Sequence, residues 1–229
     1  MAEAFRRVGK KYIIDKEQYM CLRKCLESKM IEDKHGKSKI CNIYFDTDNY
    51  ELISHSIEKT IYKDKVRVRS YNIPQKEDNV YLEIKRKYDS VVSKRRIKLK
   101  LKDVCDYLED REIEIKDMQV KKELDYYIEY FKLSPKMYVS YDREALYGVD
   151  DENFRITFDN NITARNYDLD LDKGSYGFNI FEEDKYIMEV KTLGAMPIGF
   201  VKLLAENNIF PNGYSKYGNA YTKLILNKI

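Results

Sequence analysis

The chain has 229 residues, of which 43% are hydrophobic and 35% charged, so it can bury a sizeable core and fits one large domain. Its 42 Lys and Arg against 39 Asp and Glu leave a formal net charge of only +3, so bulk charge does not indicate a polyanionic partner. No apolar run is long enough for a membrane span, and the first residues lack the pattern of a secretory signal. We therefore predict a single domain, residues 1–229, in the cytoplasm.

The first predicted element is a helix over about 16 to 30. Asp15 precedes Gln18 in the pattern of a capping box, and apolar residues then recur at helical spacing. From residue 40 to residue 100 the period changes to two, in the segments ICNIYFDT, YKDKVRVRSY, VYLEIKRKY and VVSKRRIKLKL. These segments predict successive strands, and the short connections between them favour antiparallel neighbours.

A second helix is predicted over about 119 to 131, and strands resume after it. The later strands are the segments KMYVSYDREAL, FRITFDNNITARN and KYIMEVKT. Two more helices follow, one opened by Pro197 and one beginning near Lys216. Helices together with antiparallel strands predict an α+β fold, and the absence of an internal repeat or a low-complexity linker supports a single domain.

Cations are concentrated in residues 59 to 100, which hold 14 Lys or Arg and 5 Asp or Glu, a balance of +9 within a net charge of +3. The polar side of each strand there is mostly cationic, and it consists of Lys63, Lys65, Arg67, Arg69, then Glu83, Lys85, Lys87, then Lys94, Arg96, Lys98, Lys100. Solvated outer faces are one explanation, since Lys and Arg discourage edge pairing. A closed barrel lined with cations around a polyanion explains the repetition over several strands better.

The later strands place acids beside bases. Arg155 shares a face with Asp159, and Glu189 shares one with Lys191. Plain ion pairs are one interpretation. Within a cationic channel, carboxylates would also suit a magnesium or manganese ion beside phosphates.

Other chemistries are disfavoured by the residues present. The four cysteines include no CxxC pair, and neither histidine stands in an HExxH or similar setting. The sequence also has no GxxxxGK[ST] and no GxGxxG. Phosphate would therefore be bound without a glycine loop and without a histidine or cysteine nucleophile.

The segments YKDKVRVRSY, VYLEIKRKY, VVSKRRIKL, YDREAL, RITFD, MEVKTLGAMP and YSKYGNAY, in this order, closely resemble the polyphosphate polymerase domain of the vacuolar transporter chaperone (VTC) family in its stand-alone bacterial form. The resemblance runs from about Arg7 to Tyr221. This family belongs to the triphosphate tunnel metalloenzymes, which are related to the CYTH phosphohydrolases. The resemblance implies a closed antiparallel tunnel of eight strands with flanking helices.

The resemblance also implies a transferase, an ATP–polyphosphate phosphotransferase that moves the γ-phosphate of ATP to a growing inorganic polyphosphate chain with Mn²⁺ or Mg²⁺. The implied catalytic cations are Lys65, Arg67, Arg69, Lys85, Lys94, Arg96, Arg143 and Arg155. The implied substrate-binding residues are Lys11, Lys87, Lys191 and Lys216, and the metal ligands are Glu189 and Glu83. Phosphoryl transfer needs positioning and charge neutralisation, which these residue types supply. We expect replacement of Arg67 or Arg69 by alanine to abolish activity and to leave the fold intact, or even stabilise it by relieving repulsion.

The expected partners are ATP, inorganic polyphosphate and a separately encoded membrane protein. Nucleic acid is an alternative partner, because clustered cations can follow a phosphate backbone. A tunnel of the implied kind is too narrow for a duplex, so we expect no nucleic acid.

One position departs from the family pattern. The first strand usually reads RxExK, but RRVGKKY puts Gly9 at the glutamate position and retains Arg7 and Lys11. Because glycine has no side chain to ligate a metal, Glu189 would need Glu83 or Asp159 as a second ligand. Gly9 leaves open a weakened module that binds polyphosphate or nucleotide without turnover. A triphosphatase or nucleoside triphosphatase of the same fold is a further alternative, because it differs from the polymerase only in using water as the acceptor.

Overall fold

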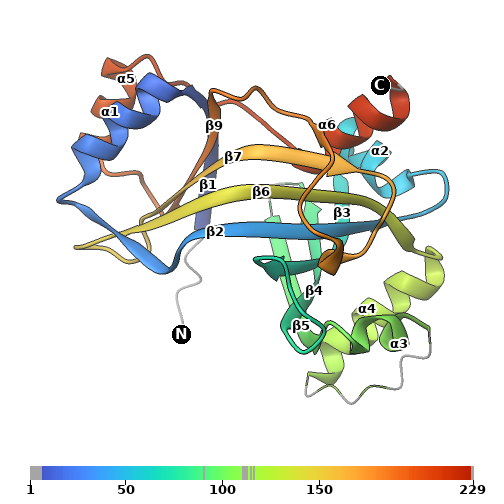
Figure 1. Ribbon diagram of the computed structural model, residues 1–229. Coiled ribbons are helices and arrows are strands. Elements are labelled where there is room, and N and C mark those ends of the chain that lie inside the picture. The colour runs from blue at the N-terminus through green and yellow to red at the C-terminus, as the bar shows by residue number, and fades with distance from the viewer. Residues whose placement is uncertain (1–6, 90, 110–112, 114, 116, 228–229) are drawn as a thin grey trace. The chain divides into compact units, whose positions relative to one another are not determined.

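The computed structural model describes residues 7–89, 91–109, 113, 115 and 117–227, and it shows an α+β fold (Figure 1). The elements in chain order are β1 (Arg7–Asp15), α1 (Lys16–Leu26), β2 (Met30–Asp46), α2 (Glu51–Ile57), β3 (Tyr62–Tyr71), β4 (Asn79–Tyr88), β5 (Val91–Lys100), α3 (Asp103–Glu109), α4 (Met118–Tyr130), β6 (Ser134–Gly148), β7 (Arg155–Arg165), η1 (Leu171–Lys173), β8 (Phe178–Asn179), β9 (Lys185–Leu193), α5 (Ile198–Glu206), α6 (Lys216–Tyr221) and the π-helical turn η2 (Thr222–Leu226).

The strands form one hydrogen-bonded order, β1-β9-β7-β6-β2-β3-β4-β5, and the two-residue strand β8 pairs with β7. The pairs β1–β9, β7–β9, β7–β8, β2–β3, β3–β4 and β4–β5 are antiparallel. The prediction of a largely antiparallel α+β fold is thus confirmed.

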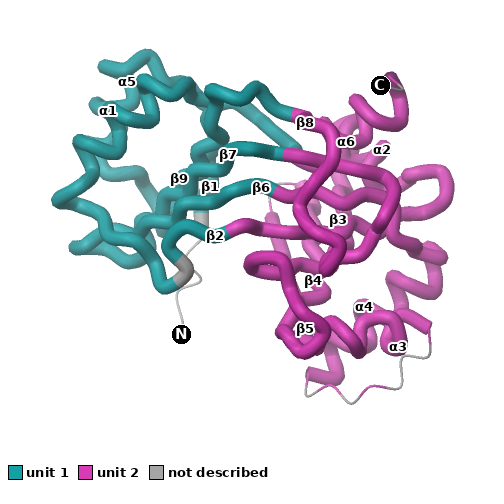
Figure 2. Tube along the Cα trace, in the orientation of Figure 1, with its two compact units in different colours: residues 1–38, 141–162, 181–215 teal, residues 39–140, 163–180, 216–229 magenta. Residues whose placement is uncertain are grey.

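The chain divides into two compact units (Figure 2). Unit 1 consists of residues 1–38, 141–162 and 181–215, and unit 2 of residues 39–140, 163–180 and 216–229. Strands β2, β6 and β7 each contribute residues to both units. Each unit has its own core.

The core of unit 1 lies between one face of its strands and the helices α1 and α5. Met188 and Val190 of β9 are buried together with Leu22 of α1 and Phe200 of α5. At the start of α1, the Asp15 carboxylate accepts from the Gln18 backbone N–H at 2.8 Å, and Gln18 returns a bond to Asp15, so the predicted capping box is present.

The core of unit 2 lies between the apolar face of β3, β4 and β5 and the helices α3 and α4. Val68, Leu82 and Ile97 stand opposite one another across the three strands and are buried with Tyr107 and Leu124 of the helices. The period-two alternation predicted for these strands is confirmed, and it turns the cations to the opposite face.

The helices differ from the prediction in number and length. The first helix ends at Leu26 rather than near residue 30, because Met30 already begins β2. The helices α2 and α3 were not predicted, since seven residues are too few to show a helical period. Among the described residues, no helix is long and apolar enough to span a membrane.

A buried arginine organises the segment between β7 and β8. The guanidinium of Arg165 is fully buried and lies 3.6 Å from the ring centroid of Tyr138 and 4.1 Å from that of Tyr176. It donates to the carbonyl oxygens of Asp168, Asp170, Gly174 and Tyr176. These carbonyl groups compensate the cost of burying the charge.

Candidate functional site

The cationic face of unit 2 consists of residues that stand opposite one another on β3, β4 and β5. Its three rows across these strands are Lys65, Lys85, Lys94; then Arg67, Glu83, Arg96; then Arg69, Tyr81, Lys98. Directly opposite side chains in antiparallel strands lie about 5 Å apart. The register therefore brings into one row cations that are 29 positions apart in the sequence, Arg69 and Lys98 in the third row and Lys65 and Lys94 in the first.

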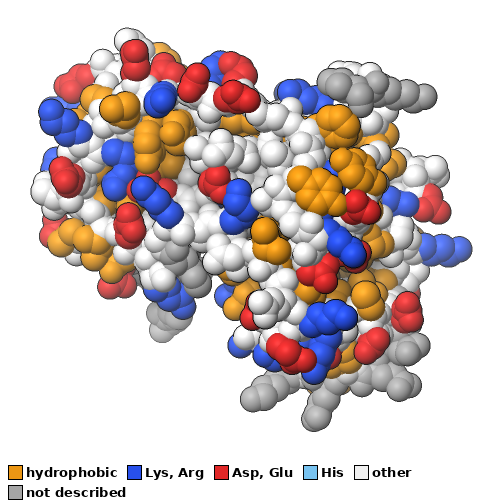
Figure 3. All heavy atoms as spheres, in the orientation of Figure 1, with side chains coloured by type: hydrophobic (Ala, Val, Ile, Leu, Met, Phe, Trp, Pro, Cys, Tyr) orange, Lys and Arg blue, Asp and Glu red, His pale blue; other side chains and the backbone are white. Residues whose placement is uncertain are grey.

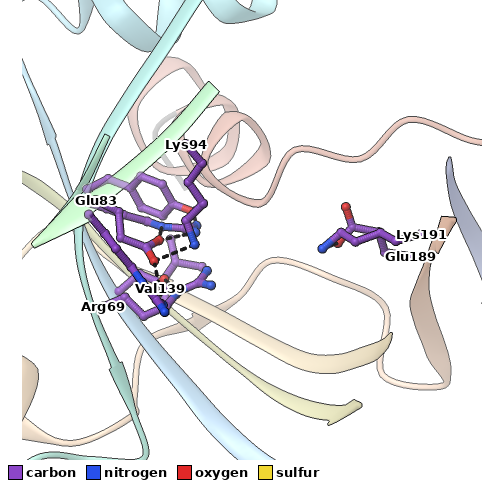
Figure 4. Close-up of polar contacts among 10 residues, drawn as sticks. Arg69, Glu83, Lys94, Val139, Glu189 and Lys191 are labelled. Atoms are coloured by element: carbon purple, nitrogen blue, oxygen red, sulfur yellow. Dashed lines mark hydrogen bonds and ion pairs between the residues drawn. The ribbon is translucent and has the colours of Figure 1, made fainter. Parts of the chain in front are cut away.

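Glu83 lies at the centre of this face and is only 1% exposed. Its Oε2 accepts from Arg67 Nε at 2.9 Å and from Arg67 Nη2 at 2.7 Å, while Lys94 Nζ lies 2.7 Å from Oε1 (Figure 4). Burial by itself would raise the pKa of Glu83, but Arg67, Arg69 and Lys94 outweigh it and lower this pKa to about 2. Glu83 is therefore an ionised counter-charge for the cations around it.

The other arginines of this face are held at two different depths. Arg69 is buried, and its Nε donates to Asn42 Oδ1 at 2.8 Å, while Asn42 Nδ2 donates to the Val139 carbonyl oxygen at 3.0 Å (Figure 4). Arg96 has a side chain that is 49% exposed, and it lies over the Tyr81 ring at 4.5 Å from the centroid. The face thus has one buried guanidinium and one that is half exposed.

The surface visible in Figure 3 has a different charge pattern, because Lys and Arg side chains are interspersed there with Asp and Glu. A solvated surface usually mixes signs in this way. The rows of unit 2 hold seven cations around a single carboxylate and include the buried residues Arg69 and Glu83. This arrangement favours an anion-binding face over an ordinary solvated one.

Unit 1 carries a second charged face on β1, β9 and β7. Gly9, Lys191 and Arg155 form one row across these strands, and Lys11, Glu189 and Thr157 form the next. Lys191 Nζ lies 3.2 Å from Glu189 Oε2 (Figure 4). Burial would raise the pKa of Glu189, but Lys191, Lys11 and Arg143 outweigh it and lower this pKa to about 2.

Arg143 and Asp159 form a bidentate pair beside this second face. Arg143 Nε donates to Asp159 Oδ1 at 2.6 Å, and its Nη2 donates to Oδ2 at 2.7 Å. Burial would lower the pKa of Arg143, but the Asp159 carboxylate outweighs it and raises this pKa further above the ordinary range. Arg143 therefore keeps its charge, and the Asp159 carboxylate is engaged by a cation.

The predicted site residues are divided between the two units. Unit 2 contains Lys65, Arg67, Arg69, Glu83, Lys85, Lys87, Lys94, Arg96 and Lys216. Unit 1 contains Lys11, Arg143, Arg155, Glu189 and Lys191. In unit 1, Lys11 Nζ also donates to the Tyr214 carbonyl oxygen at 2.7 Å, and Arg155 Nε to that of Glu152 at 3.2 Å.

A model of the VTC domain matches residues 6–225 of this chain. The chain belongs to the VTC domain family. The family expected from the sequence is thereby confirmed, and membership supports a function related to nucleotides or polyphosphate. A search of the curated proteins gave no match.

Among solved structures, this VTC domain is similar to a candidate adenylate cyclase from Vibrio parahaemolyticus, with 11% identity and a TM-score of 0.48, covering 93% of this chain and 96% of the other. It is also similar to a protein from Pyrococcus horikoshii OT3, with 14% identity and a TM-score of 0.48, covering 98% and 100%. The Mediator head module of Schizosaccharomyces pombe gives 12% identity and a TM-score of 0.42, covering 88% and 90%. Similarity at this level does not identify an activity.

Of the two glutamates expected from the sequence to bind a divalent cation, Glu189 has the more accessible side chain, at 21% exposed against 1% for Glu83. The described residues contain no group of three or more His, Cys, Asp or Glu side chains suited to a metal. Magnesium, however, usually keeps several waters and binds through one or two carboxylates together with substrate phosphates. Glu189 is ionised and its side chain is 21% exposed, whereas both oxygens of Glu83 already contact cations.

Two polar residues of β2 belong to the cationic face but were not singled out from the sequence. In the register of β2 with β3, Tyr44 stands opposite Arg67 and Asn42 stands opposite Arg69. The alternation of ICNIYFDT places both residues on one side, away from Ile43 and Phe45, so the period-two signal was available. Neither residue is a cation, and the face was predicted from its Lys and Arg residues alone.

Proposed function

We propose that this VTC domain is a polyphosphate polymerase that transfers the γ-phosphate of ATP to a growing inorganic polyphosphate chain with Mn²⁺ or Mg²⁺. The observation that supports it best is the set of cationic rows across β3, β4 and β5 around the buried Glu83. Such rows match a linear polyanion, whose charges repeat along its length. The family provides the link to polyphosphate.

In the proposed reaction an oxygen of the terminal phosphate of the chain attacks the γ-phosphorus of ATP. The bond from the γ-phosphorus to the bridging oxygen breaks, and ADP leaves with that oxygen. No protein nucleophile is needed, because binding and charge neutralisation do most of the work in phosphoryl transfer.

The residues of the chain have separate parts in this reaction. Arg67 and Arg69 are held by Glu83 and Asn42, so they present fixed donors to phosphate oxygens. Lys94 and Arg96 are partly exposed and supply charge that can follow a moving chain. A divalent ion held by Glu189 with the nucleotide would neutralise phosphate charge when bound.

The closed tunnel implied by the family resemblance is part of this proposal, and an experimental structure with bound triphosphate would test it. The proposal also includes action in the cytoplasm beside a separately encoded membrane-protein partner, without nucleic acid. Oligonucleotide that binds tightly and resists displacement by triphosphate would contradict the last point.

Gly9 favours a second candidate, a module that binds polyphosphate or nucleotide without turnover. The first strand brings no carboxylate to Glu189, so the divalent ion has fewer protein ligands than the family pattern provides. Hydrolysis of triphosphate or nucleoside triphosphate is a third outcome, which differs from polymerisation only in using water as the acceptor.

The test is to incubate the purified protein with ATP and manganese and to analyse the products by phosphorus NMR and by gel. Bridging phosphates together with ADP are expected. Orthophosphate without chains would indicate a triphosphatase, and no reaction despite tight binding of triphosphate would indicate the binding module.

Neighbouring arginines of β5 provide a matched control. Arg96 lies on the cationic face opposite Glu83, whereas Arg95 points to the other face and pairs with Glu123 at 3.3 Å. Arg96→Gln should lower turnover by about tenfold or more, in line with the loss of one charge-assisted contact. Arg95→Gln should leave turnover unchanged, and equal effects of the two substitutions would contradict the assignment of the face.

A further inference from the structure

Tyr44 on β2 lies at the edge of the cationic rows and is only 5% exposed. Arg67 Nη1 donates to its hydroxyl oxygen at 3.1 Å, while Nε and Nη2 of the same guanidinium bind Glu83. The orientation of Arg67 is therefore set from two sides, by a carboxylate on β4 and a phenol on β2.

The Tyr44 ring is itself held in place from α6. It stacks on Tyr217, with ring centroids 4.5 Å apart and an interplanar angle of 11°. The Tyr217 hydroxyl donates to Asp46 Oδ2 at 2.9 Å, and Asp46 is fully buried. This chain of contacts connects Arg67 to α6, whose first residue is Lys216.

We propose that Tyr44 is a positioning residue for bound phosphate, which holds the Arg67 guanidinium toward the triphosphate and links the cationic rows to α6. The inference rests on the proposed function, because it requires Arg67 to bind phosphate. Tyr44 is neutral, whereas the site residues predicted from the sequence are all charged.

The charges around Tyr44 make its hydroxyl a sensor of phosphate binding. Burial by itself would raise the pKa of Tyr44, but Arg67, Arg69 and Lys65 outweigh it and lower this pKa to about 8. Asp46 on β2, Tyr217 on α6, Glu83 on β4 and Lys94 on β5 are further titratable groups in the same network of contacts. A bound triphosphate offsets the nearby cations and favours the neutral phenol, so it should raise the pKa of Tyr44 again.

The experiment is to add sodium triphosphate without metal at a pH of about 9, where Tyr44 is largely ionised, and to record the tyrosinate absorbance. We expect the tyrosinate absorbance to decrease in the wild-type protein and to stay unchanged in Tyr44→Phe. Tyr44→Phe should also bind triphosphate roughly tenfold more weakly by calorimetry, the effect of one lost hydrogen bond to a charged group. Tyr126→Phe is the matched control, because Tyr126 is 56% exposed on α4, and it should keep both signals.

The experiment distinguishes an error about Tyr44 from an error about the phosphate site. If wild-type protein binds triphosphate but Tyr44→Phe binds it equally well and shows the same absorbance change, the inference about Tyr44 is wrong while the phosphate site stands. If the wild-type protein does not bind triphosphate, both are overturned. Circular dichroism of Tyr44→Phe must show the native fold, and Tyr44→Trp, which keeps a stacking ring without the hydroxyl, provides a second variant that should also lose the absorbance change.

Discussion

Glu83 sets the charge balance of the cationic face at the scale of single residues. Arg67, Lys94 and Arg96 all contact its carboxylate, at 2.7, 2.7 and 3.9 Å. A buried carboxylate depends on such partners, because an unpaired charge in the interior is costly. From these contacts we expect Arg67 to stabilise the fold, whereas the sequence alone led us to expect that its removal would leave the fold intact or more stable.

Arg67→Ala should abolish triphosphate binding and lower the free energy of unfolding by about 1 to 3 kcal/mol, because Glu83 retains Lys94 but loses two hydrogen bonds. Urea denaturation measures the second effect. The double variant Arg67→Met with Glu83→Gln removes both charges, so it should regain stability without regaining binding. A rise in stability of Arg67→Ala alone would show that repulsion dominates this face.

Gly9 is the second single residue with a large expected effect, because it determines whether a second carboxylate can lie beside Glu189. A Cβ at this position would lie 3.9 Å from Glu189 Oε1 and 3.8 Å from Lys191 Cγ, which is ordinary van der Waals contact. A side chain can therefore be added without displacing a neighbour, and it would begin beside the Glu189 carboxylate.

Gly9→Glu should strengthen Mn²⁺ binding by about tenfold or more, because a second carboxylate joins Glu189. Calorimetry with manganese in the presence of triphosphate measures the change. Gly9→Gln has the same size without the charge and should leave the affinity unchanged. Equal affinities of the two variants would contradict a metal site beside position 9.

At the scale of elements, Asp46 joins the end of β2 to two helices. Its Oδ1 accepts from the backbone N–H groups of Thr47 and Leu52, and its Oδ2 accepts from that of Ile53 and from the Tyr217 hydroxyl. The α2 helix has no side-chain cap at its N-cap residue, so the buried carboxylate replaces one. A helix of seven residues needs such support.

Asp46→Ala should lower the free energy of unfolding by about 2 to 4 kcal/mol, because it leaves buried N–H groups of α2 and the Tyr217 hydroxyl without their acceptor. Urea denaturation followed by circular dichroism measures the loss. Asp48→Asn is the control two positions away, since Asp48 has a side chain that is 91% exposed and forms a surface pair with Lys136. The free energy of unfolding of Asp48→Asn should hardly differ from that of the wild-type protein. Similar losses in both variants would contradict the role of Asp46.

At the scale of the whole molecule, the two units are built on one scheme. Each packs helices on the apolar face of its strands and carries cations around one central glutamate on the other face. The pKa values of Glu83 and Glu189 are both lowered from 4.5 to about 2. A fall in pH should therefore affect each unit in the same way, by protonating its central glutamate.

The stability that these two carboxylates contribute should be fully present above a pH of about 4.5 and should be lost as the pH falls toward about 2. The sign follows because the folded state holds both protons less tightly than the unfolded chain does. Urea midpoints measured from about pH 6 down to about pH 3 test this. Glu83→Gln should flatten the acid limb, whereas Glu182→Gln, with a 71% exposed side chain, should not.

Much of the fold could be predicted from the sequence, because a strand has a period of two residues wherever it lies. YKDKVRVRSY and VVSKRRIKLKL assigned Arg67, Arg69 and Arg96 to polar faces before any partner was known, and Gln18 after Asp15 marked the start of α1. These are local signals, carried by neighbouring residues.

Only the tertiary structure decided which side chains meet. That Glu83 neutralises Arg67 and Lys94, that Tyr44 holds Arg67, and that Asp46 caps α2 while binding Tyr217 depend on strand register and on contacts across as many as 171 positions of sequence. Alternation predicts the face of a residue but not its neighbour on the next strand, because register is set by the packing of the whole sheet and its helices.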